Sequence, residues 1–176
     1  MKINRIWAMS NKWTFKIQPI KELLNKYNVG KDWIDPFCGN SYLCEIRNDL
    51  NPKNKIAQYH LEALEFVNIL DKKYSGAIFD PPYSLTQVSR SYENLGIKSW
   101  NKNNKSGGFP KVKDRISQII KTNGITISFG WNSVGMGKGR NFEIIEILLV
   151  CHGGNKNDTI CTVEKKTKRR LIGYKF

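Results

Sequence analysis

The feature of this 176-residue sequence that most constrains its fold is the alternation of short apolar runs with amphipathic stretches of helical period. The apolar runs are too short for helices but have the length of buried strands. The amphipathic stretches carry apolar side chains at helical spacing, as in Leu23, Leu24 and Tyr27. Strands that alternate with helices in this way indicate a mostly parallel sheet covered by helices.

Start and stop signals give the bounds of the expected elements. Pro19 suits the first turn of a helix, and Asn28 with Gly30 supplies its end. A turn at Gly153-Gly154 separates the last two apolar runs, which predicts an antiparallel hairpin. The expected strands are 33–34, 43–47, 56–60, 76–79, 124–131, 142–151 and 158–164, and the expected helices are 19–28, 62–72, 85–93 and 111–122.

The predicted fold class is α/β, with a mostly parallel Rossmann-like sheet and an antiparallel C-terminal hairpin. Parallel crossovers need a dozen or more residues, and the links 39–49, 49–62 and 131–142 are short for that purpose. We therefore expect loops in place of some crossover helices. Residues 2–16 are aromatic and basic and are expected to be irregular, and one helix across 57–72 is an alternative to a strand followed by a helix.

Polar motifs follow the expected strands at the point where each one ends. Asp35 follows the first strand, Asp49 follows the second, and Asp80 follows the strand 76–79. In open α/β sheets, ligands bind at the carboxyl ends of the strands. The sequence therefore predicts a ligand site where these three acidic side chains meet.

The tetrapeptide Asp80-Pro81-Pro82-Tyr83, here named the Asp80–Tyr83 motif, carries the most specific chemistry. A proline forces its predecessor into an extended conformation and offers no N–H, so this backbone presents acceptors. The carboxylate of Asp80 and the carbonyl of Pro81 can accept both hydrogens of one amino group, while Tyr83 supplies a flat face for a base. Two such acceptors raise the electron density on an exocyclic nitrogen, so the pattern indicates methylation of a base amine by positioning and electrostatics.

These residues resemble those of the S-adenosylmethionine-dependent DNA amino-methyltransferases of the adenine-N6 branch. The Asp80–Tyr83 motif is similar to their catalytic signature, and Asp35-Pro36-Phe37-Cys38-Gly39 is similar to their cofactor loop. The resemblance extends from about Trp13 to Glu164 and looks closest to the small forms of phages and mobile elements. It implies a Rossmann-like methyltransferase sheet, S-adenosylmethionine as cofactor, and N6 of adenine in DNA as the target.

The resemblance also assigns roles around the cofactor. Asp35 would pair with its ammonium group, Gly39 would let the backbone approach closely, and Asp49 would hold the ribose diol. Glu62 or a neighbour would meet the adenine amino group. The other residues expected at the cofactor are Trp13, Thr14, Phe15, Pro36, Phe37 and Leu50.

The charge of the chain favours a polyanionic partner. The 29 Lys and Arg residues exceed the 15 Asp and Glu residues, which gives a net charge of +14. A target base has to leave its stack, and cations near the pocket would hold the flanking phosphates. The expected nucleic-acid-binding residues are Arg90, Lys98, Trp100, Lys102, Lys105, Lys111, Lys113, Lys138 and Arg140.

The sequence also restricts the setting of the protein. Cys38, Cys44, Cys151 and Cys161 form no metal-binding pattern, so we expect reduced, mostly buried thiols and no metal. We find no secretion signal and no apolar run of the ~20 residues that a membrane span needs, so a cytoplasmic location is expected. Residues 1–176 are expected to form one domain without a separate target-recognition domain. Target specificity would then come from residues 84–110, a homodimer or a partner subunit.

Three alternatives to a DNA methyltransferase remain. Methyltransferases of ribosomal RNA that act on guanine N2 carry similar motifs, so RNA is the second candidate substrate. An inactive nucleic-acid-binding subunit could keep the same pocket for architecture. Protein-glutamine methyltransferases fit less well, because they generally have Asn where this chain has Asp80.

Overall fold

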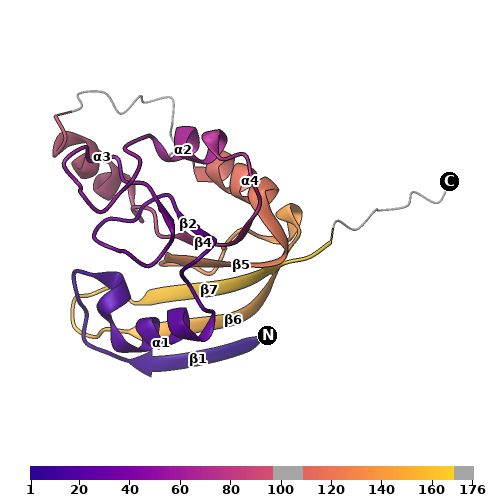
Figure 1. Cartoon of the computed structure of the whole chain (residues 1–176). Helices are drawn as coiled ribbons and strands as arrows, with labels where there is room; N and C mark the ends of the chain where they lie inside the picture. The colour runs from indigo at the N-terminus through magenta and orange to yellow at the C-terminus, as the bar shows by residue number, and fades with distance from the viewer. Residues whose placement is uncertain (97–108, 169–176) are drawn as a thin grey trace.

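The computed structural model describes residues 1–96 and 109–168 (Figure 1). Within them, one seven-stranded sheet has the strand order β1-β6-β7-β5-β4-β2-β3. The strands are β1 (Lys2–Trp7), β2 (Trp33–Asp35), β3 (Ile46–Arg47), β4 (Tyr74–Phe79), β5 (Ile120–Gly130), β6 (Phe142–Cys151) and β7 (Thr159–Lys166). The helices are α1 (Gln18–Lys26), α2 (Ala63–Ile69), α3 (Leu85–Glu93) and α4 (Phe109–Ile119), with short 3-10 turns η1 (Thr14–Lys16) and η2 (Lys138–Arg140).

The pairing of the strands confirms the predicted fold class. β3, β2, β4 and β5 run parallel to one another, whereas β7 is antiparallel to both β5 and β6. β6 and β7 form the expected hairpin, with Val150 opposite Thr159 next to its turn. The parallel strands bring their carboxyl ends, and hence the polar motifs that follow them, to one edge of the sheet.

Two apolar clusters hold the helices on opposite faces of the sheet. On one face, α1 places Ile20 and Leu24 against Ile127 and Val163. On the other face, α2 and α4 pack over the middle of the sheet (Figure 1), with Phe66 and Ile116 fully buried against its strands. The half of the sheet with β2, β4 and β5 is therefore covered on both faces.

The prediction that residues 2–16 are irregular is wrong for the first part of this segment. β1 lies at the edge of the sheet, parallel to β6, with Lys2 beside Glu146 and Trp7 beside Cys151. Asn4 donates a side-chain hydrogen bond to Glu146 at 3.0 Å, which fixes the register of the two strands. Five of the six residues of β1 are exposed, so its sequence lacks the alternation that marks a half-buried strand.

The short crossovers are confirmed, and the strands beside them are reduced. β3 covers only Ile46–Arg47 of the expected strand 43–47, and the expected strand 56–60 contributes a single bridge between Asn48 and Tyr59. Side chains replace the missing ladder, since the Arg47 guanidinium donates to the carbonyls of Cys44 (2.7 Å) and Ile56 (3.0 Å). The loops are thereby fixed without longer strands.

The other elements agree with expectation to within a few residues. α3 covers the expected residues 85–93, and α2 begins after Glu62, which excludes one helix across 57–72. The four cysteines are buried and unpaired, as the sequence predicts. In the described part of the chain, no helix is both long enough and apolar enough to cross a membrane.

Candidate functional site

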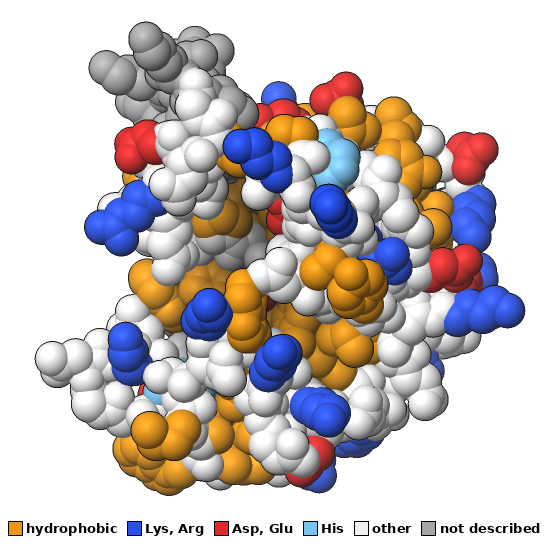
Figure 2. Space-filling view, turned by 60° about the vertical axis from the view of Figure 1, so that its left-hand side comes forward, with side chains coloured by type: hydrophobic (Ala, Val, Ile, Leu, Met, Phe, Trp, Pro, Cys, Tyr) orange, Lys and Arg blue, Asp and Glu red, His pale blue; other side chains and the backbone are white. Residues whose placement is uncertain are grey.

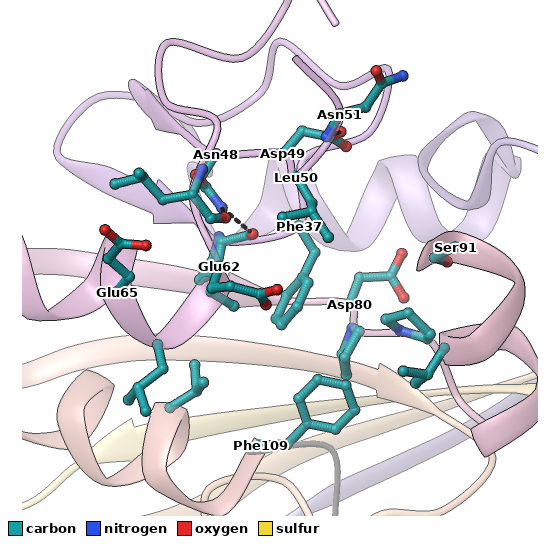
Figure 3. Close-up of a pocket in the computed structure, with 18 of the residues that line it drawn as sticks. Phe37, Asn48, Asp49, Leu50, Asn51, Glu62, Glu65, Asp80, Ser91 and Phe109 are labelled. Atoms are coloured by element: carbon teal, nitrogen blue, oxygen red, sulfur yellow. Dashed lines mark hydrogen bonds between the residues drawn. The ribbon is translucent and has the colours of Figure 1, made fainter. Parts of the chain in front are cut away.

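A cavity of about 1060 Å³ opens at the carboxyl ends of β2, β3 and β4 (Figures 2 and 3). Four segments supply its walls: the ends of these strands, the start of α2, the inner side of α3 and the start of α4. The lining residues that matter below are Thr14, Pro36, Phe37, Asn48, Asp49, Leu50, Leu61, Glu62, Asp80, Pro81, Pro82, Tyr83, Tyr92, Phe109 and Lys111.

The Asp80–Tyr83 motif leaves β4 and enters α3 in a fixed conformation. The backbone N–H of Tyr83 donates to Oε1 of Gln87 at 2.6 Å, and the Ser84 hydroxyl caps α3 by accepting from the Gln87 N–H at 3.2 Å. The Tyr83 hydroxyl reaches back and donates to Oδ1 of Asp80. The helix that follows the motif therefore holds the direction in which the Asp80 carboxylate points.

The environment of Asp80 moves its titration toward neutral pH. Burial raises its pKa to about 6, and the hydroxyls of Tyr83 and Thr14 oppose that rise by hydrogen bonding to the charged form. By solvent accessibility Asp80 is partly exposed toward the cavity, so a ligand can reach it. The group is an ionised acceptor at neutral pH that lies close to its own titration range.

The end of β2 contains Asp35, a carboxyl group that is buried and, within the described part of the chain, incompletely hydrogen bonded. Asp35 is fully buried, and one oxygen accepts the Phe37 N–H at 3.0 Å. Its other oxygen, Oδ2, has no hydrogen-bond partner among the described residues. Burial, followed by the nearby charges of Asp80 and Asp49, raises the pKa of Asp35 to about 8. Asp35 lies directly behind the lining residues Pro36 and Phe37 and would become ionised beside a cation.

Phe37 and Gly39 complete the loop after β2. The Phe37 ring contacts Phe79 and Phe109 edge-on, with centroids 5.6 and 5.7 Å apart, and forms an apolar floor for the cavity. Gly39 has a φ of +48°, which favours glycine, but it does not belong to the cavity lining. Its carbonyl accepts from the Asn54 side chain at 2.7 Å, so the loop is tied to the segment after β3.

The end of β3 contributes Asn48, Asp49 and Leu50, which all line the cavity. Asn48 is 1% exposed and donates to the carbonyls of Pro36 and Leu61, both at 3.0 Å. It thereby connects three walls of the cavity, a role that sequence reasoning missed because Asn is common in turns. Oδ1 of Asp49 accepts the Asn51 N–H at 2.8 Å, which holds this side chain at the cavity wall beside Asn51 (Figure 3).

Glu62 and Tyr92 close the outer side of the cavity. The Tyr92 hydroxyl, from α3, lies 2.8 and 2.6 Å from the two carboxylate oxygens of Glu62, at the start of α2. The contact links the two helices across the opening. Sequence reasoning proposed Glu62 but not Tyr92, whose only signal is its position on the helix after the motif.

The cavity is acidic although the chain is strongly basic. Asp49, Glu62 and Asp80 lie around it in Figure 3, and Asp35 lies behind it close enough to be affected by the charges of two of them. The negative charges of Asp80 and Asp49 add to burial in raising the pKa of Asp35, and a cation in the cavity would oppose that effect. The arrangement is therefore suited to a ligand that carries positive charge.

A second cavity of about 340 Å³ lies on the other side of the Asp80–Tyr83 motif and shares Pro81, Pro82 and Tyr83 with the first. Its lining also includes Lys113, Ser128 and Trp131. The Tyr83 ring meets Trp131 nearly edge-on, with centroids 5.7 Å apart. The motif thus forms a wall between a larger acidic cavity and a smaller aromatic one.

Ser128 and Lys113 are two of the polar residues in the lining of the smaller cavity. Ser128 is 6% exposed, and its hydroxyl has no partner among the described residues. The Lys113 ammonium donates to the carbonyl of Gly135 at 2.6 Å and lies 5.2 Å from the centre of the Phe79 ring. Burial lowers the pKa of Lys113. The lining of this cavity thus includes a residue with a buried hydroxyl that has no partner among the described residues, and a cation.

The structure distributes the remaining expected cofactor residues over different environments. Thr14 lines the larger cavity, whereas Phe15 packs into the core against Phe129, with ring centroids 5.1 Å apart. Trp13 lies at the surface beside Lys12 and is outside the lining. The structure therefore brings Thr14 alone of these three neighbours to the cavity.

The cations expected to bind nucleic acid also lie in different environments. Lys111 lines the larger cavity, and Arg90 and Lys138 are exposed. Arg140 instead pairs with Asp114 at 2.7 Å and donates to the carbonyl of Met136 at 2.9 Å, so it secures the loop before β6 to α4. The candidates outside the described residues are Lys98, Trp100, Lys102 and Lys105.

Comparison with known proteins identifies the fold. No protein-family model matches the chain, and no curated protein matches it in sequence. Among solved structures, it is similar to TrmN from Thermus thermophilus, with 12% identity and a TM-score of 0.53 over 85% of this chain and 49% of the other. The chain thus spans about half the length of that protein.

Two further solved structures are matched over nearly their whole length. One is an rRNA methylase from Streptococcus thermophilus, with 9% identity and a TM-score of 0.52 over 90% of this chain and 100% of the other. The other is the N-methyltransferase NodS from Bradyrhizobium japonicum in complex with S-adenosyl-L-homocysteine, with 7% identity and a TM-score of 0.53 over 90% of each chain. At these identities the likeness shows the fold, which is that of methyltransferases.

Proposed function

We propose that this protein transfers a methyl group from S-adenosylmethionine to an exocyclic amino nitrogen of a nucleic-acid base, namely N6 of adenine in DNA. The observation that carries the proposal is the Asp80–Tyr83 motif as a wall between an acidic cavity and an aromatic one. A cationic methyl donor suits the first cavity, and a planar base suits the second.

The larger cavity fits S-adenosylmethionine in charge and size. That molecule supplies a methyl group on a positively charged sulfur and also carries an ammonium group. Asp35, whose Oδ2 has no partner among the described residues, could hold the ammonium group, and Asp49 could hold the ribose hydroxyls. The volume of about 1060 Å³ lies at the upper end of ordinary ligand pockets. The solved N-methyltransferase with bound S-adenosyl-L-homocysteine supports the same ligand class.

The chemistry assigned to the chain is acceptance and positioning. The carboxylate of Asp80 and the carbonyl of Pro81 would accept the two amine hydrogens, which favours a localised lone pair on nitrogen. Asp80 has to be ionised for this purpose, and the Tyr83 and Thr14 hydroxyls favour that form. Tyr83 therefore has a second role beside offering its ring, because its hydroxyl helps to keep the acceptor charged.

The target base would occupy the smaller cavity. There the rings of Tyr83 and Trp131 supply aromatic contact, and the Ser128 hydroxyl could bond to a ring nitrogen. Asp at the first position of the motif favours adenine over cytosine within the family that the sequence resembles. The cost of extruding the base from its stack is a few kcal/mol, which contacts outside the cavity would have to offset.

RNA is the second candidate substrate, and a specific observation favours it. The rRNA methylase from Streptococcus thermophilus is matched over 100% of its length, so the same compact fold occurs in a protein of that description. DNA and RNA would use the same site but give different methylated nucleosides, so analysis of the products distinguishes the two substrates.

The test is methylation of DNA and of RNA by the purified chain with S-adenosylmethionine, followed by digestion and mass spectrometry of the nucleosides. N6-methyladenine in DNA is the expected product, and the variant Asp80→Ala should form it at least 10²-fold more slowly. N2-methylguanine or N6-methyladenine confined to RNA would overturn the DNA assignment. S-adenosyl-L-homocysteine binding without methyl transfer to either polymer would indicate the inactive subunit.

A further inference from the structure

We propose that residues 1–16 together with Trp131 form a binding surface for an unpaired nucleic-acid strand next to the target base. We name this set the N-terminal surface; the proposal rests on the proposed function. The sequence alone assigns no such role to β1. The partner is defined by its chemistry, which is a polyanion with exposed aromatic bases.

Exposed tryptophans are the first observation. Trp7 is 64% exposed, Trp131 43% and Trp13 36%, whereas Trp33 in the core is 4% exposed. Two of the exposed rings have a cation beside them, since the Arg5 guanidinium lies 5.8 Å from the Trp7 ring and the Lys12 ammonium lies 4.8 Å from the Trp13 ring. Aromatic faces with adjacent cations are the usual means of holding single strands, because bases stack while the cations meet phosphates.

Charge is the second observation. Residues 1–21 contain five Lys and Arg side chains and no acidic one, and the first acidic residue of the chain is Glu22. Lys2, Arg5, Lys12 and Lys16 are exposed. Figure 2 shows Lys and Arg side chains distributed around the hollow at this end of the molecule. A phosphate backbone beside the acidic cavity would therefore meet positive charge.

The strand register connects this surface to the site. Arg5 lies beside Leu149 of β6, Leu149 beside Ile160 of β7, and Ile160 beside Gly130 of β5. Neighbouring strands are about 4.8 Å apart, so three steps place the backbone of Arg5 about 14 Å from that of Gly130. Gly130 and the following Trp131 line the smaller cavity.

The side chains of this row face the side of the sheet away from α1. Asn4 bonds to Glu146, which also binds Tyr27 next to α1 at 2.6 Å, so Asn4 lies on the α1 side. Because side chains alternate along a strand, Arg5 and Trp7 lie on the opposite side. That side also carries Ser128, which lines the smaller cavity, so Arg5 and Trp7 lie on the same face of the sheet as this cavity.

The other end of the segment reaches the catalytic motif directly. After β1 the chain turns inward at η1 (Figure 1), where Thr14 lines the larger cavity and hydrogen bonds to Asp80. Residues 1–16 thus extend from the sheet edge to the acceptor of the target amine. A strand on Trp7 and Arg5 would be aligned with the position of the flipped base.

A second copy of the chain is the competing occupant, because the outer edge of β1 is unpaired within the described residues. In a two-fold dimer the same patch meets itself. Arg5 and Lys2 of each copy would then lie near those of the other, and like charges in such contacts are unfavourable. A polyanionic strand meets the same cations with opposite charge, and we therefore assign the surface to nucleic acid.

The test is the fluorescence anisotropy of a labelled single-stranded DNA oligonucleotide that contains one adenine. Loss of a stacked base is worth about 1–3 kcal/mol, so Trp7→Ala should weaken binding about 5- to 150-fold. Trp7→Phe should recover part of that loss, because any flat ring stacks. Arg5→Gln should reduce the slope of log affinity against log salt by about 0.7, the value for one phosphate contact on a single strand.

Matched controls separate local from general effects. Lys31, just before β2, and Lys165, near the end of β7, are exposed cations away from the site. Lys31→Gln and Lys165→Gln remove the same charge and should leave the single-strand affinity nearly unchanged. S-adenosyl-L-homocysteine affinity and melting temperature should be the same in Trp7→Ala, Arg5→Gln and the wild type.

Three results would overturn the proposal. In the first, Trp7→Ala weakens binding of the oligonucleotide no more than Lys31→Gln does. In the second, it weakens the binding of duplex and of single-stranded DNA equally. In the third, it converts a dimer to a monomer in light scattering without changing the affinity for the oligonucleotide. Failure of the proposed function looks different, since the wild type would then bind the strand through Trp7 but methylate neither DNA nor RNA.

Discussion

The larger cavity and the N-terminal surface lie next to each other and have opposite charge. The cavity contains Asp49, Glu62 and Asp80, whereas residues 1–21 carry five cations and no acid. The net charge of +14 describes neither region. Under the proposed function this separation lets one basic protein bind a cationic donor and a polyanionic substrate, because its acidic side chains are gathered in the cavity.

Removal of the Asp80 carboxylate, at the boundary of the two regions, should reduce activity most. Asp80→Ala should lower turnover about 10²- to 10³-fold, because one preorganised hydrogen-bonding group for the transition state is lost. Binding of S-adenosyl-L-homocysteine and of a single-stranded oligonucleotide should change little. Steady-state methyl transfer and titration of both ligands provide the measurement. Wild-type turnover in this variant would remove the carboxylate from the mechanism.

The second prediction concerns the pH dependence of stability that the buried Asp35 carboxyl causes when no cation is bound. Because the pKa of Asp35 is raised to about 8 from 3.8, its stabilising contribution is complete below about pH 4 and is lost as the pH rises toward 8. Relative to Asp35→Asn, the wild type should lose about 1.4 kcal/mol of unfolding free energy per pH unit between pH 5 and 7, or about 10² in the folding equilibrium.

Chemical denaturation of both proteins at several pH values checks the second prediction. The variant retains the shape of the side chain and an acceptor for the Phe37 N–H, so it serves as the uncharged reference. Groups that titrate in both proteins, such as Asp80, cancel in the difference. Parallel stability curves would mean that Asp35 is already ionised in the folded protein.

The third prediction tests whether the carboxylate of Asp49 binds the cofactor. Asp49→Asn should weaken S-adenosyl-L-homocysteine binding about 10- to 100-fold, the value of a hydrogen bond to a charged group. Isothermal titration calorimetry measures the change, with Glu143→Gln as the matched control because Glu143 is an exposed carboxylate on β6 outside the cavity lining. Equal affinities for the two variants would contradict the assignment of Asp49.

The smallest effect concerns the Tyr83 hydroxyl, which stacking alone does not require. In Tyr83→Phe the ring remains, but the donor that lowers the pKa of Asp80 is lost, so that pKa should rise above about 6. Because the ionised form is active, activity is lost as the pH falls through this pKa. The variant should therefore be several-fold less active near pH 6 and similar to the wild type above pH 8.

A pH profile of kcat/KM for both proteins measures this shift, with Tyr42→Phe as a control on an exposed tyrosine. Tyr83→Ala should cost more, about one to two orders of magnitude, because the aromatic face is lost as well. That loss should shrink on single-stranded targets, where extrusion of the base is less costly. If the acid side of the kcat/KM profile is the same in Tyr83→Phe as in the wild type, the Tyr83 hydroxyl does not affect the titration of Asp80.

Much of the site could be predicted because strand ends determine it. Asp35, Asp49 and Asp80 each follow an apolar run, and parallel strands bring their carboxyl ends to one edge. Thr14, Pro36, Phe37, Leu50 and Glu62 were expected from the resemblance, and the structure places them in the cavity lining. Trp13, Phe15 and Gly39 could not be sorted in this way, because neighbours in a loop can point to the cavity, the core or the solvent.

The α/β class, the hairpin, the strand ends and the Asp80–Tyr83 motif follow from the amino-acid order, because short-range periodicity and proline geometry encode them locally. The folded chain was needed to show that residues 2–7 pair with β6, that Asn48 connects three walls, and that Tyr92 reaches Glu62. These contacts join residues far apart in the chain. An exposed edge strand carries no alternation of its own, and the free edge of its neighbour supplies the hydrogen bonds that define it.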